Sequence, residues 1–465
     1  MKGIVRVAVV VHLGIVAAVT GSQPILARPD SSLDLVARDE SGFVRTVSPN
    51  GRLDLNNPFF KDLGTNGRTC LSCHRPGEGW TITPESIQAR FDESDGLDPL
   101  FRSNDGSNCD GAGGSTVDER RAAYSLLLHR GLIRVAIDVP DGAEFFVDHV
   151  DDPYECGAPL RTLSLYRRPL PSTNVSFLSA VMWDGRESSA STTILQDLAR
   201  QADDATMGHA QASVHLTDDE ARQIVAFETR LFTAQMVDDH AGPLFASGAH
   251  GGPTRLSRQP FFAGINDPIG LNPTGAAFDP HVFDLFDDWA GLNQRRRDPA
   301  IAARAAIARG QEIFNGRTFE IAGVAGLNDE TFPNGVTVPT TLTGTCTTCH
   351  DSPNIGNHSV KAPLNIGLSD AARRTPDMPL YTLVRTATGE SVTTTDPGRA
   401  MITGKWADVG KFKGPILRGL AARAPYFHNG SAPALADVVD FYDARFNLQL
   451  SAKERDDLIA FLRAL

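Results

Sequence analysis

Two copies of the motif Cys-x-x-Cys-His are the residues of this chain best suited to chemistry. Two cysteines at this spacing can form thioether bonds to the two vinyl groups of one porphyrin, and the adjacent histidine can ligate its iron. The pattern therefore predicts two covalently attached haem c groups. The residues expected to hold them are Cys70, Cys73 and His74 for the first group and Cys346, Cys349 and His350 for the second.

A zinc site and a redox dithiol are the alternative uses of these cysteines, and two Cys-x-x-Cys pairs can supply four thiolates to one zinc ion. A zinc site would leave the histidine after each pair without a role. It would also leave the export signal and the helix repeat described below unexplained. Haem attachment is therefore the preferred interpretation.

The N-terminal segment, residues 1–27, is typical of a secretory signal peptide. Lys2 and Arg6 precede an apolar run, and cleavage is expected after Ala27 or, alternatively, near Gly21. An uncleaved anchor is the second alternative. No later stretch is apolar enough to span a bilayer. The mature protein is therefore expected in the periplasm, without stable membrane insertion.

Two cysteines lie outside the haem motifs, Cys109 and Cys156. In an oxidising compartment a disulfide between them is expected. Two free thiols are the alternative.

The composition is that of an ordinary globular protein of two or three domains, with 465 residues, 41% apolar and 22% charged. The formal net charge of -12 argues against nucleic acid or an anionic membrane as the main partner. An acidic surface would suit a basic electron-donor protein, although acidic globular proteins are common.

A distant repeat relates residues 216–231 to residues 450–465. Each copy begins with a capping-box pattern, Thr217 to Glu220 and Ser451 to Glu454, followed by apolar residues spaced for one helix face. Because each copy lies downstream of its own haem motif, the repeat predicts two related domains that end alike.

The expected organisation follows from this repeat and from composition. A first haem domain is predicted over 28–240, with an insertion at about 80–166, and a second over 300–465. A linker or insertion, 241–299, lies between them. The segments rich in Gly, Pro, Asp and Asn are interpreted as long loops, and strand signals are sparse. The predicted fold is therefore mainly α, with two cytochrome c-like domains and long loop insertions.

Three further stretches resemble segments of the bacterial di-haem cytochrome c peroxidase/MauG family. Residues 182–186, Met-Trp-Asp-Gly-Arg, resemble its W-D-G-R segment between the haems. Residues 411–418 resemble its K-F-K-x-P-x-L-R run, and residues 424–430 its P-Y-F-H-x-G segment. The likeness covers most of the mature chain except the two insertions.

The resemblance implies a division of labour between the two haems. The haem on His74 would be the open site that meets hydrogen peroxide, and the haem on His350 would be six-coordinate and relay electrons. Trp183 would lie between them as the relay. The alternative role for Trp183 is that of a large core aromatic.

The resemblance also implies a sixth ligand for the second haem, a methionine or a tyrosine about a dozen residues beyond the H-x-G segment. Tyr442 occupies that position. A tyrosinate ligand favours oxidised iron, whereas methionine raises the potential, so Tyr442 favours the MauG-like branch. A buried core tyrosine is the alternative, and Met378 and Met401 are rival ligands outside the family position.

The distal pocket departs from the family pattern. Gln196 matches the family's pocket glutamine, but the glutamate expected ten residues later is Thr206. Threonine cannot hold a proton as a base near neutral pH, so weak peroxidase turnover is expected unless Asp203, Asp204 or His209 replaces the glutamate.

A second departure concerns calcium, which the family commonly holds between its haems with an asparagine upstream of the W-D-G-R segment. Arg168 stands at that position. The remaining ligands would be backbone carbonyls and water, so the resemblance implies calcium only weakly.

The expected function is that of a periplasmic oxidoreductase that activates hydrogen peroxide. Its electrons would come from a small redox protein, or from a protein or small-molecule substrate oxidised at a distance. An oxygenase similar to the rubber oxygenases is the alternative enzyme, since those manage without the pocket glutamate. A plain di-haem electron carrier is the alternative outside enzymes.

Overall fold

We describe the fold from a computed structural model, which places residues 34–49, 54–157, 159–292 and 298–465. The predicted signal peptide lies outside these residues. Among the helices of the described part, none is both long and apolar enough to cross a membrane.

The prediction of a mainly α fold is wrong. The described residues are 30% helical and 17% strand, so the fold is mixed α/β with several small sheets. The strands are only two to seven residues long, and several pair with strands far away in the sequence. Strands this short contain too few alternations of apolar and polar residues to be recognised in the sequence. A pairing partner far away in the chain leaves no local pattern either.

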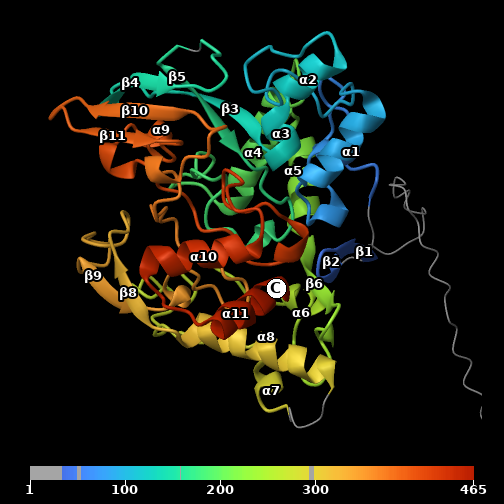
Figure 1. Cartoon of the computed structure of the whole chain (residues 1–465), viewed down its shortest axis with the longest axis vertical. Helices are drawn as coiled ribbons and strands as arrows, with labels where there is room; N and C mark the ends of the chain where they lie inside the picture. Colours follow the sequence, from blue (N-terminus) through green and yellow to red (C-terminus); the bar gives the residue numbers. More distant parts are fainter. Residues whose placement is uncertain (1–33, 50–53, 158, 293–297) are drawn as a thin grey trace, which may run out of the picture.

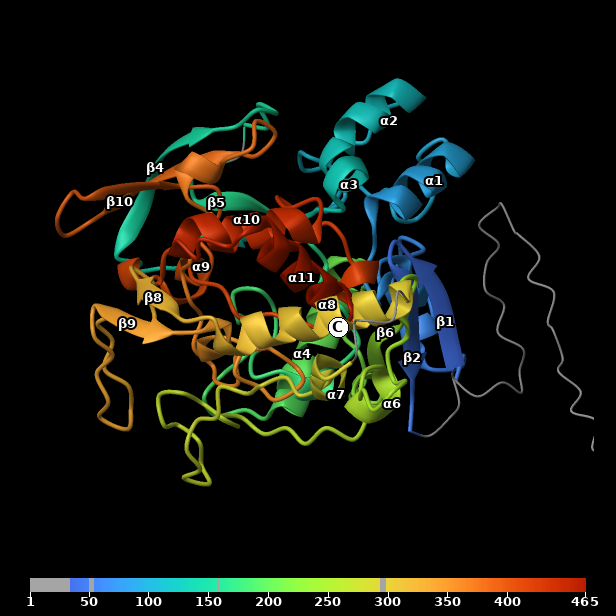
Figure 2. The same cartoon turned by 60° about the horizontal axis from the view of Figure 1, so that its bottom comes forward.

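Three of the longer helices belong to the C-terminal half of the chain and pack together. Helix α8 (Pro299–Gly316) packs along α11 (Ala452–Arg463), and α10 (Leu435–Phe446) lies against α11, as the views in Figures 1 and 2 both show. Phe314 of α8 and Phe461 of α11 meet at 5.6 Å between ring centroids. This aromatic contact is part of the largest apolar cluster of the described residues.

The helix repeat is confirmed. Helix α5 (Asp218–Glu228) begins at the N-cap Thr217, and α11 begins at the N-cap Ser451, each with the predicted capping box. The remaining helices of four or more residues are α1 (Pro84–Ser94), α2 (Val117–Ala123), α3 (Ser125–Arg130), α4 (Ile194–Gly208), α6 (Pro253–Leu256), α7 (Asp287–Ala290) and α9 (Ala400–Thr403).

The strands form four antiparallel sheets. A four-stranded sheet has the order β1 (Asp34–Asp39), β2 (Gly42–Val47), β6 (Phe232–Asp238), β7 (Gly242–Pro243). A three-stranded sheet has the order β11 (Ser391–Thr394), β10 (Leu380–Arg385), β4 (Phe145–Asp151). The two-stranded sheets pair β3 (Ile133–Asp138) with β5 (Thr162–Arg167) and β8 (Phe319–Ala322) with β9 (Thr341–Gly344).

The first predicted insertion is not a set of loops. It contains α1 to α3 and β3 to β5, and its strand β4 pairs with β10 of the C-terminal half (Figure 1). In that pairing Val150 lies opposite Tyr381 and Phe146 opposite Val384. The insertion is therefore joined to the C-terminal half through a shared sheet.

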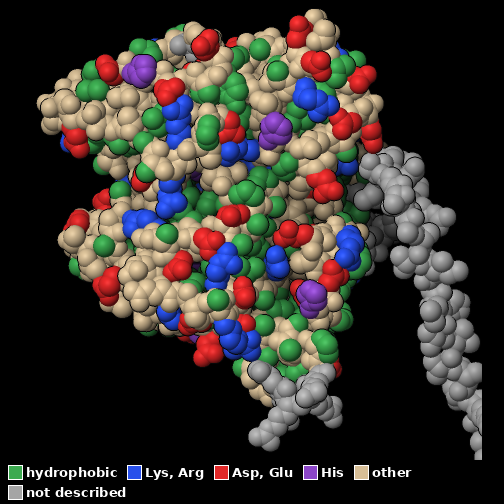
Figure 3. Space-filling model, viewed as in Figure 1, with side chains coloured by type: hydrophobic (Ala, Val, Ile, Leu, Met, Phe, Trp, Pro, Cys, Tyr) green, Lys and Arg blue, Asp and Glu red, His purple; other side chains and the backbone are tan. Residues whose placement is uncertain are grey.

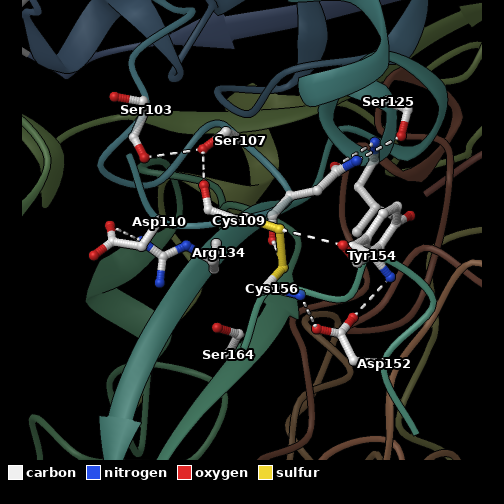
Figure 4. Close-up of a disulfide and its surroundings, with 12 residues drawn as sticks. Ser103, Ser107, Cys109, Asp110, Ser125, Arg134, Asp152, Tyr154, Cys156 and Ser164 are labelled. Atoms are coloured by element: carbon white, nitrogen blue, oxygen red, sulfur yellow. Dashed lines mark hydrogen bonds and ion pairs between the residues drawn. A yellow bond between two sulfur atoms is a disulfide. The ribbon is translucent and has the colours of Figure 1, made fainter. Parts of the chain in front are cut away.

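The predicted disulfide is confirmed. Cys109 and Cys156 are joined with an S–S distance of 2.01 Å, across 47 residues of the insertion. Figure 4 shows the bridge beside Tyr154, and Asp152 accepts hydrogen bonds from the amides of Tyr154 and Cys156 at 3.0 and 2.9 Å. The bridge therefore ties the loop before α2 to the turn between β4 and β5.

Candidate functional site

The two Cys-x-x-Cys-His motifs fold in the same way. Each begins with a 3-10 turn, Cys70–Ser72 in the first and Cys346–Thr348 in the second. The histidine amide then donates to the carbonyl of the first cysteine, at 3.0 Å for His74 and 3.1 Å for His350. The second motif thus repeats the local structure of the first.

The two histidines are also oriented alike. Nδ1 of His74 lies 3.0 Å from the carbonyl oxygen of Trp80, and Nδ1 of His350 lies 2.6 Å from that of Gly356. A carbonyl only accepts, so each Nδ1 carries the proton and each Nε2 keeps its lone pair for a metal. Both acceptor residues have left-handed backbones, with φ of 61° and 77°.

Burial keeps these histidines neutral. It lowers the pKa of His74 to about 4 and also lowers the pKa of His350. Neutral imidazole is the form that binds metals. The orientation and the protonation state therefore both fit iron ligation.

One cavity of about 400 Å³ reaches both motifs. Its lining is largely apolar and includes the cysteines and the histidine of each motif. The four motif cysteines are not in disulfides, and burial raises the pKa of Cys70 to about 12. Neutral thiols at the wall of a large apolar cavity fit attachment points for a flat apolar cofactor.

The zinc alternative finds no support. Over residues 34–49, 54–157, 159–292 and 298–465, no group of three or more His, Cys, Asp or Glu side chains is arranged to hold a metal ion. The two cysteine pairs therefore do not converge on a single four-thiolate site.

The cavity also offers cations that lack carboxylate partners. Lys413 is 7% exposed, and its ammonium lies 5.6 Å from the centroid of the Trp183 ring. Arg423 donates only to backbone carbonyls, those of Ile416 and Gly419. Among the described residues neither cation has an ion-pair partner, and burial lowers the pKa of Lys413 to about 8. Cations without carboxylate partners in the cavity that reaches both motifs fit the carboxylate side chains of haem.

Trp183 lines the same cavity and is held from two sides. Its indole Nε1 donates to the carbonyl of Arg168 at 2.8 Å, and its ring lies 6.3 Å from that of His428. His428 is almost fully buried, and neither ring nitrogen has a hydrogen-bond partner among the described residues. The structure thus places Trp183 between Arg168 and His428 of the P-Y-F-H-x-G segment.

A buried ion cluster supports the segment that carries Trp183. Arg167 donates to Asp184 at 2.5 Å and to both oxygens of Asp396, at 2.7 and 2.9 Å. All three side chains are at most 2% exposed. Burial alone would lower the pKa of Arg167, but the two carboxylates raise it above its ordinary value.

Tyr442 also lines the cavity, on the side of the second motif. Its pKa is raised by burial, with smaller contributions from Cys349 and Cys346. Its hydroxyl has no hydrogen-bond partner within the described part of the chain. The rival residues Met378 and Met401 are instead buried in two other apolar clusters and do not line the cavity.

The structure does not place Gln196 in the cavity. Gln196 is exposed in the first turn of α4, where its side chain accepts from the amide and the hydroxyl of Thr193. Thr206 does line the cavity, and its hydroxyl donates to the carbonyl of Ala202 within α4. Asp203 lies outside the cavity and accepts from His215 at 2.7 Å. Asp204 is exposed and also lies outside the cavity.

His209 is the candidate acid–base residue that the structure does bring to the cavity. It lies directly after α4, and its Nδ1 is 2.5 Å from Oδ2 of Asp105. Asp105 is 5% exposed, and Arg68 donates to its other oxygen at 2.5 Å. Burial would raise the pKa of Asp105, but the bond from His209 and the charge of Arg68 lower it overall. An ionised Asp105 fixes the proton on Nδ1 and leaves Nε2 of His209 free to accept one.

Sequence reasoning missed Asp105, because it lies 104 residues from His209 in the chain. It also missed Glu228, a 6% exposed residue at the end of α5 that lines the cavity. Burial raises the pKa of Glu228 to about 8. The helix repeat could have indicated Glu228, because this acid aligns with the apolar Leu462 of α11. Leu462 lines the cavity as well.

Parts of this chain are similar in sequence to known proteins of the cytochrome c type. The profile of a family described as "RoxA-like, cytochrome c-like" matches residues 411–448. The cytochrome-c peroxidase IdrP1 of Pseudomonas sp. (strain SCT) is 28% identical over 228 residues, which are 44% of this chain and 58% of that protein. The cytochrome-c peroxidase IdrP2 of Denitromonas iodatirespirans is 34% identical over 142 residues, 26% of this chain and 36% of its own.

Two further matches are shorter or more distant. The cytochrome c peroxidase Ccp of Escherichia coli (strain K12) is 37% identical over 76 residues, 16% of each chain. A solved MauG-like protein associated with microbial copper homeostasis aligns over 65% of this chain and 74% of its own, at 18% identity and a TM-score of 0.32. The aligned regions span about half or less of the curated relatives named here. The peroxidase matches confirm the resemblance to the bacterial di-haem cytochrome c peroxidase/MauG family that the motifs indicated, and each of them covers less than half of this chain.

Proposed function

We propose that this chain is an exported di-haem c oxidoreductase that reacts with hydrogen peroxide at its first motif. Cys70, Cys73 and His74 would hold one haem, and Cys346, Cys349 and His350 the other. The bound haems would supply one-electron chemistry and a site for peroxide. The signal-like segment and the disulfide support a periplasmic location.

The observation that carries this function is the His209–Asp105 pair beside the first motif. Splitting peroxide requires a base that takes a proton from one oxygen and returns it to the departing one. His209 can do both through Nε2, since Asp105 fixes the proton on Nδ1 and holds the ring in place. In this way the pair would replace the pocket glutamate of the family, which is Thr206 in this chain.

The second motif would store and relay electrons. Tyr442, with its unpartnered hydroxyl in the cavity, would be the sixth ligand and close this site to peroxide. Trp183, which lines the cavity shared by both motifs, would couple the two groups. A small redox protein or an oxidisable substrate would deliver electrons from outside. Figure 3 shows acidic and basic side chains interspersed over one face, which marks no single docking patch there.

The test is a titration of the purified ferric protein with hydrogen peroxide, followed by ultraviolet-visible spectroscopy and stopped flow. His209→Gln should slow the reaction by about 10²–10⁴-fold, the usual contribution of a positioned acid–base residue. His215→Gln is the matched control, since His215 also pairs with an aspartate but lies outside the cavity. Equal rates in the wild type and His209→Gln would remove His209 from this role.

An oxygenase is the second candidate, and the observation that favours it is Thr206 at the cavity wall. A protein that ignores peroxide but binds oxygen stably would support this alternative. A protein with two low-spin haems that reacts with neither would be an electron carrier.

A further inference from the structure

The guanidinium of Arg168 lies in a cage of backbone carbonyls. Nη1 donates to the carbonyls of Arg130 and Gly131 at 3.2 and 3.1 Å, and Nη2 faces those of Arg423 and Ala424 at 3.4 and 3.5 Å. Arg168 is 4% exposed, and it forms no ion pair with any carboxylate of the described chain. A buried cation that is satisfied only by carbonyl oxygens is unusual, because buried arginines normally pair with acids.

The surrounding backbone is shaped to admit this side chain. Gly131 ends α3 with a left-handed backbone (φ 60°), and a Cβ added there would overlap Nη1 of Arg168. Burial lowers the pKa of Arg168 to about 10, so the group remains charged at neutral pH. The glycine and the arginine therefore form a matched pair.

The cage lies where three distant segments meet. Arg130 and Gly131 belong to the first insertion, and Arg423 and Ala424 directly precede the P-Y-F-H-x-G segment. The amide of Arg168 donates to the carbonyl of His428 at 2.6 Å, and its own carbonyl accepts from Trp183. Carbonyl oxygens gathered from separate loops are typical ligands of calcium, but here the guanidinium already takes them. The residues present therefore do not fit a calcium ion.

We propose that the guanidinium of Arg168 is a built-in cation that takes the structural role of a divalent ion at this junction. It holds the insertion, the Trp183 segment and the P-Y-F-H-x-G segment together without a metal. The wild-type protein is then independent of calcium, and removing the guanidinium exposes a latent calcium site formed by the freed carbonyls.

The first test uses the holoprotein as purified. Elemental analysis should find no stoichiometric calcium, and EGTA should leave the melting temperature unchanged. Bound calcium, or a melting temperature that falls with EGTA, would overturn the inference. Calcium content and thermal stability can be read without any peroxide reaction, so this outcome is independent of the proposed function.

The second test exchanges the cation. Arg168→Asn should lower the melting temperature by several degrees, and added calcium should restore part of the loss in a saturable way. Arg120→Asn is the matched control: Arg120 also donates to two backbone carbonyls, those of Asp95 and Ser115, but it is only partly buried. Arg120→Asn should change little and should not respond to calcium. An Arg168→Asn protein that is insensitive to calcium would contradict the latent site.

A third variant separates the cage from general damage. Gly131→Ala strains the left-handed backbone in any background, but it also displaces the guanidinium in the wild type. Its effect on the melting temperature should therefore be clearly smaller in the Arg168→Asn background. Equal losses in the two backgrounds would show that the two residues do not act as a pair.

Discussion

The two haem motifs of this chain have the same local structure and different surroundings. Each has a 3-10 turn, a histidine aligned by a carbonyl six residues later, and a capped helix from the repeat. Around the first motif the cavity wall carries His209, Asp105 and the acid Glu228. Around the second it carries Tyr442 and, in place of Glu228, Leu462. In the proposed function, the repeated local structure would attach both haems, and the side chains that differ between the copies would set their different reactivities.

The largest effect is expected from removing one attachment site at a time. Replacing Cys70 and Cys73 by alanine, or Cys346 and Cys349, should lower the mass of the mature protein by one haem. The pyridine haemochrome absorbance should fall by half in each variant. Cys109→Ala is the control that should keep both haems. A wild-type mass that carries zinc and no porphyrin would refute both sites.

Tyr442→Phe should act on the second site alone. Loss of its oxygen should convert a low-spin ferric signal to a high-spin or water-bound one in the absorption and electron paramagnetic resonance spectra, with the first signal unchanged. Tyr381→Phe is the matched control, because Tyr381 is a buried tyrosine outside the cavity whose hydroxyl donates to Ser164 at 2.5 Å. An unchanged spectrum in Tyr442→Phe would make Tyr442 a core residue.

The disulfide should stabilise the insertion of the first half more than the rest of the chain. Replacing Cys109 and Cys156 by serine should lower the free energy of unfolding by about 2–4 kcal/mol, as expected for a loop of this size. Hydrogen exchange should place the loss near β3 to β5. If both thiols of the denatured, non-reduced wild type can be alkylated, the bridge is absent.

Glu228 should make the stability of the first site depend on pH. Its pKa is raised from 4.5 to about 8 by burial, so the folded state binds one proton more than the unfolded state between these values. The free energy of unfolding should then fall as pH rises from 4.5 to about 8, by at most about 1.4 kcal/mol per pH unit from this group. Glu228→Leu, which copies Leu462, should remove this part of the slope. A slope identical to that of the wild type would show that Glu228 ionises normally.

The features that the sequence predicted depend on patterns of neighbouring residues or on cysteine chemistry. The haem motifs, the capped helices α5 and α11 and the disulfide depend on residues close in sequence or on cysteine chemistry, and the structure agrees with the helices and the disulfide. The mixed α/β class was missed because β4 reaches its partner β10 only across more than 200 residues. The same reason hides the contact between His209 and Asp105.

The position of a residue within a family motif did not always predict where its side chain lies in the structure. Gln196 fits the family spacing, yet the N-terminal capping box of α4 holds its side chain outside the cavity. Arg168 was recognised as a departure from the family, but its carbonyl cage could not be foreseen. The cage depends on the placement of Gly131 and Arg423, which are 37 and 255 residues away from Arg168.

The ion cluster of Arg167, Asp184 and Asp396 limits how far the W-D-G-R segment can be moved between proteins. Its aspartate is fully buried, and its charge is compensated by an arginine seventeen residues upstream, which in turn needs a second acid from the C-terminal half. A graft of the four residues alone would keep the pair of Asp184 with the partly exposed Arg186, at 3.2 Å, but would lose the buried, shorter pair with Arg167. A transfer of the W-D-G-R segment into a designed scaffold should therefore include Arg167 and Asp396 as well.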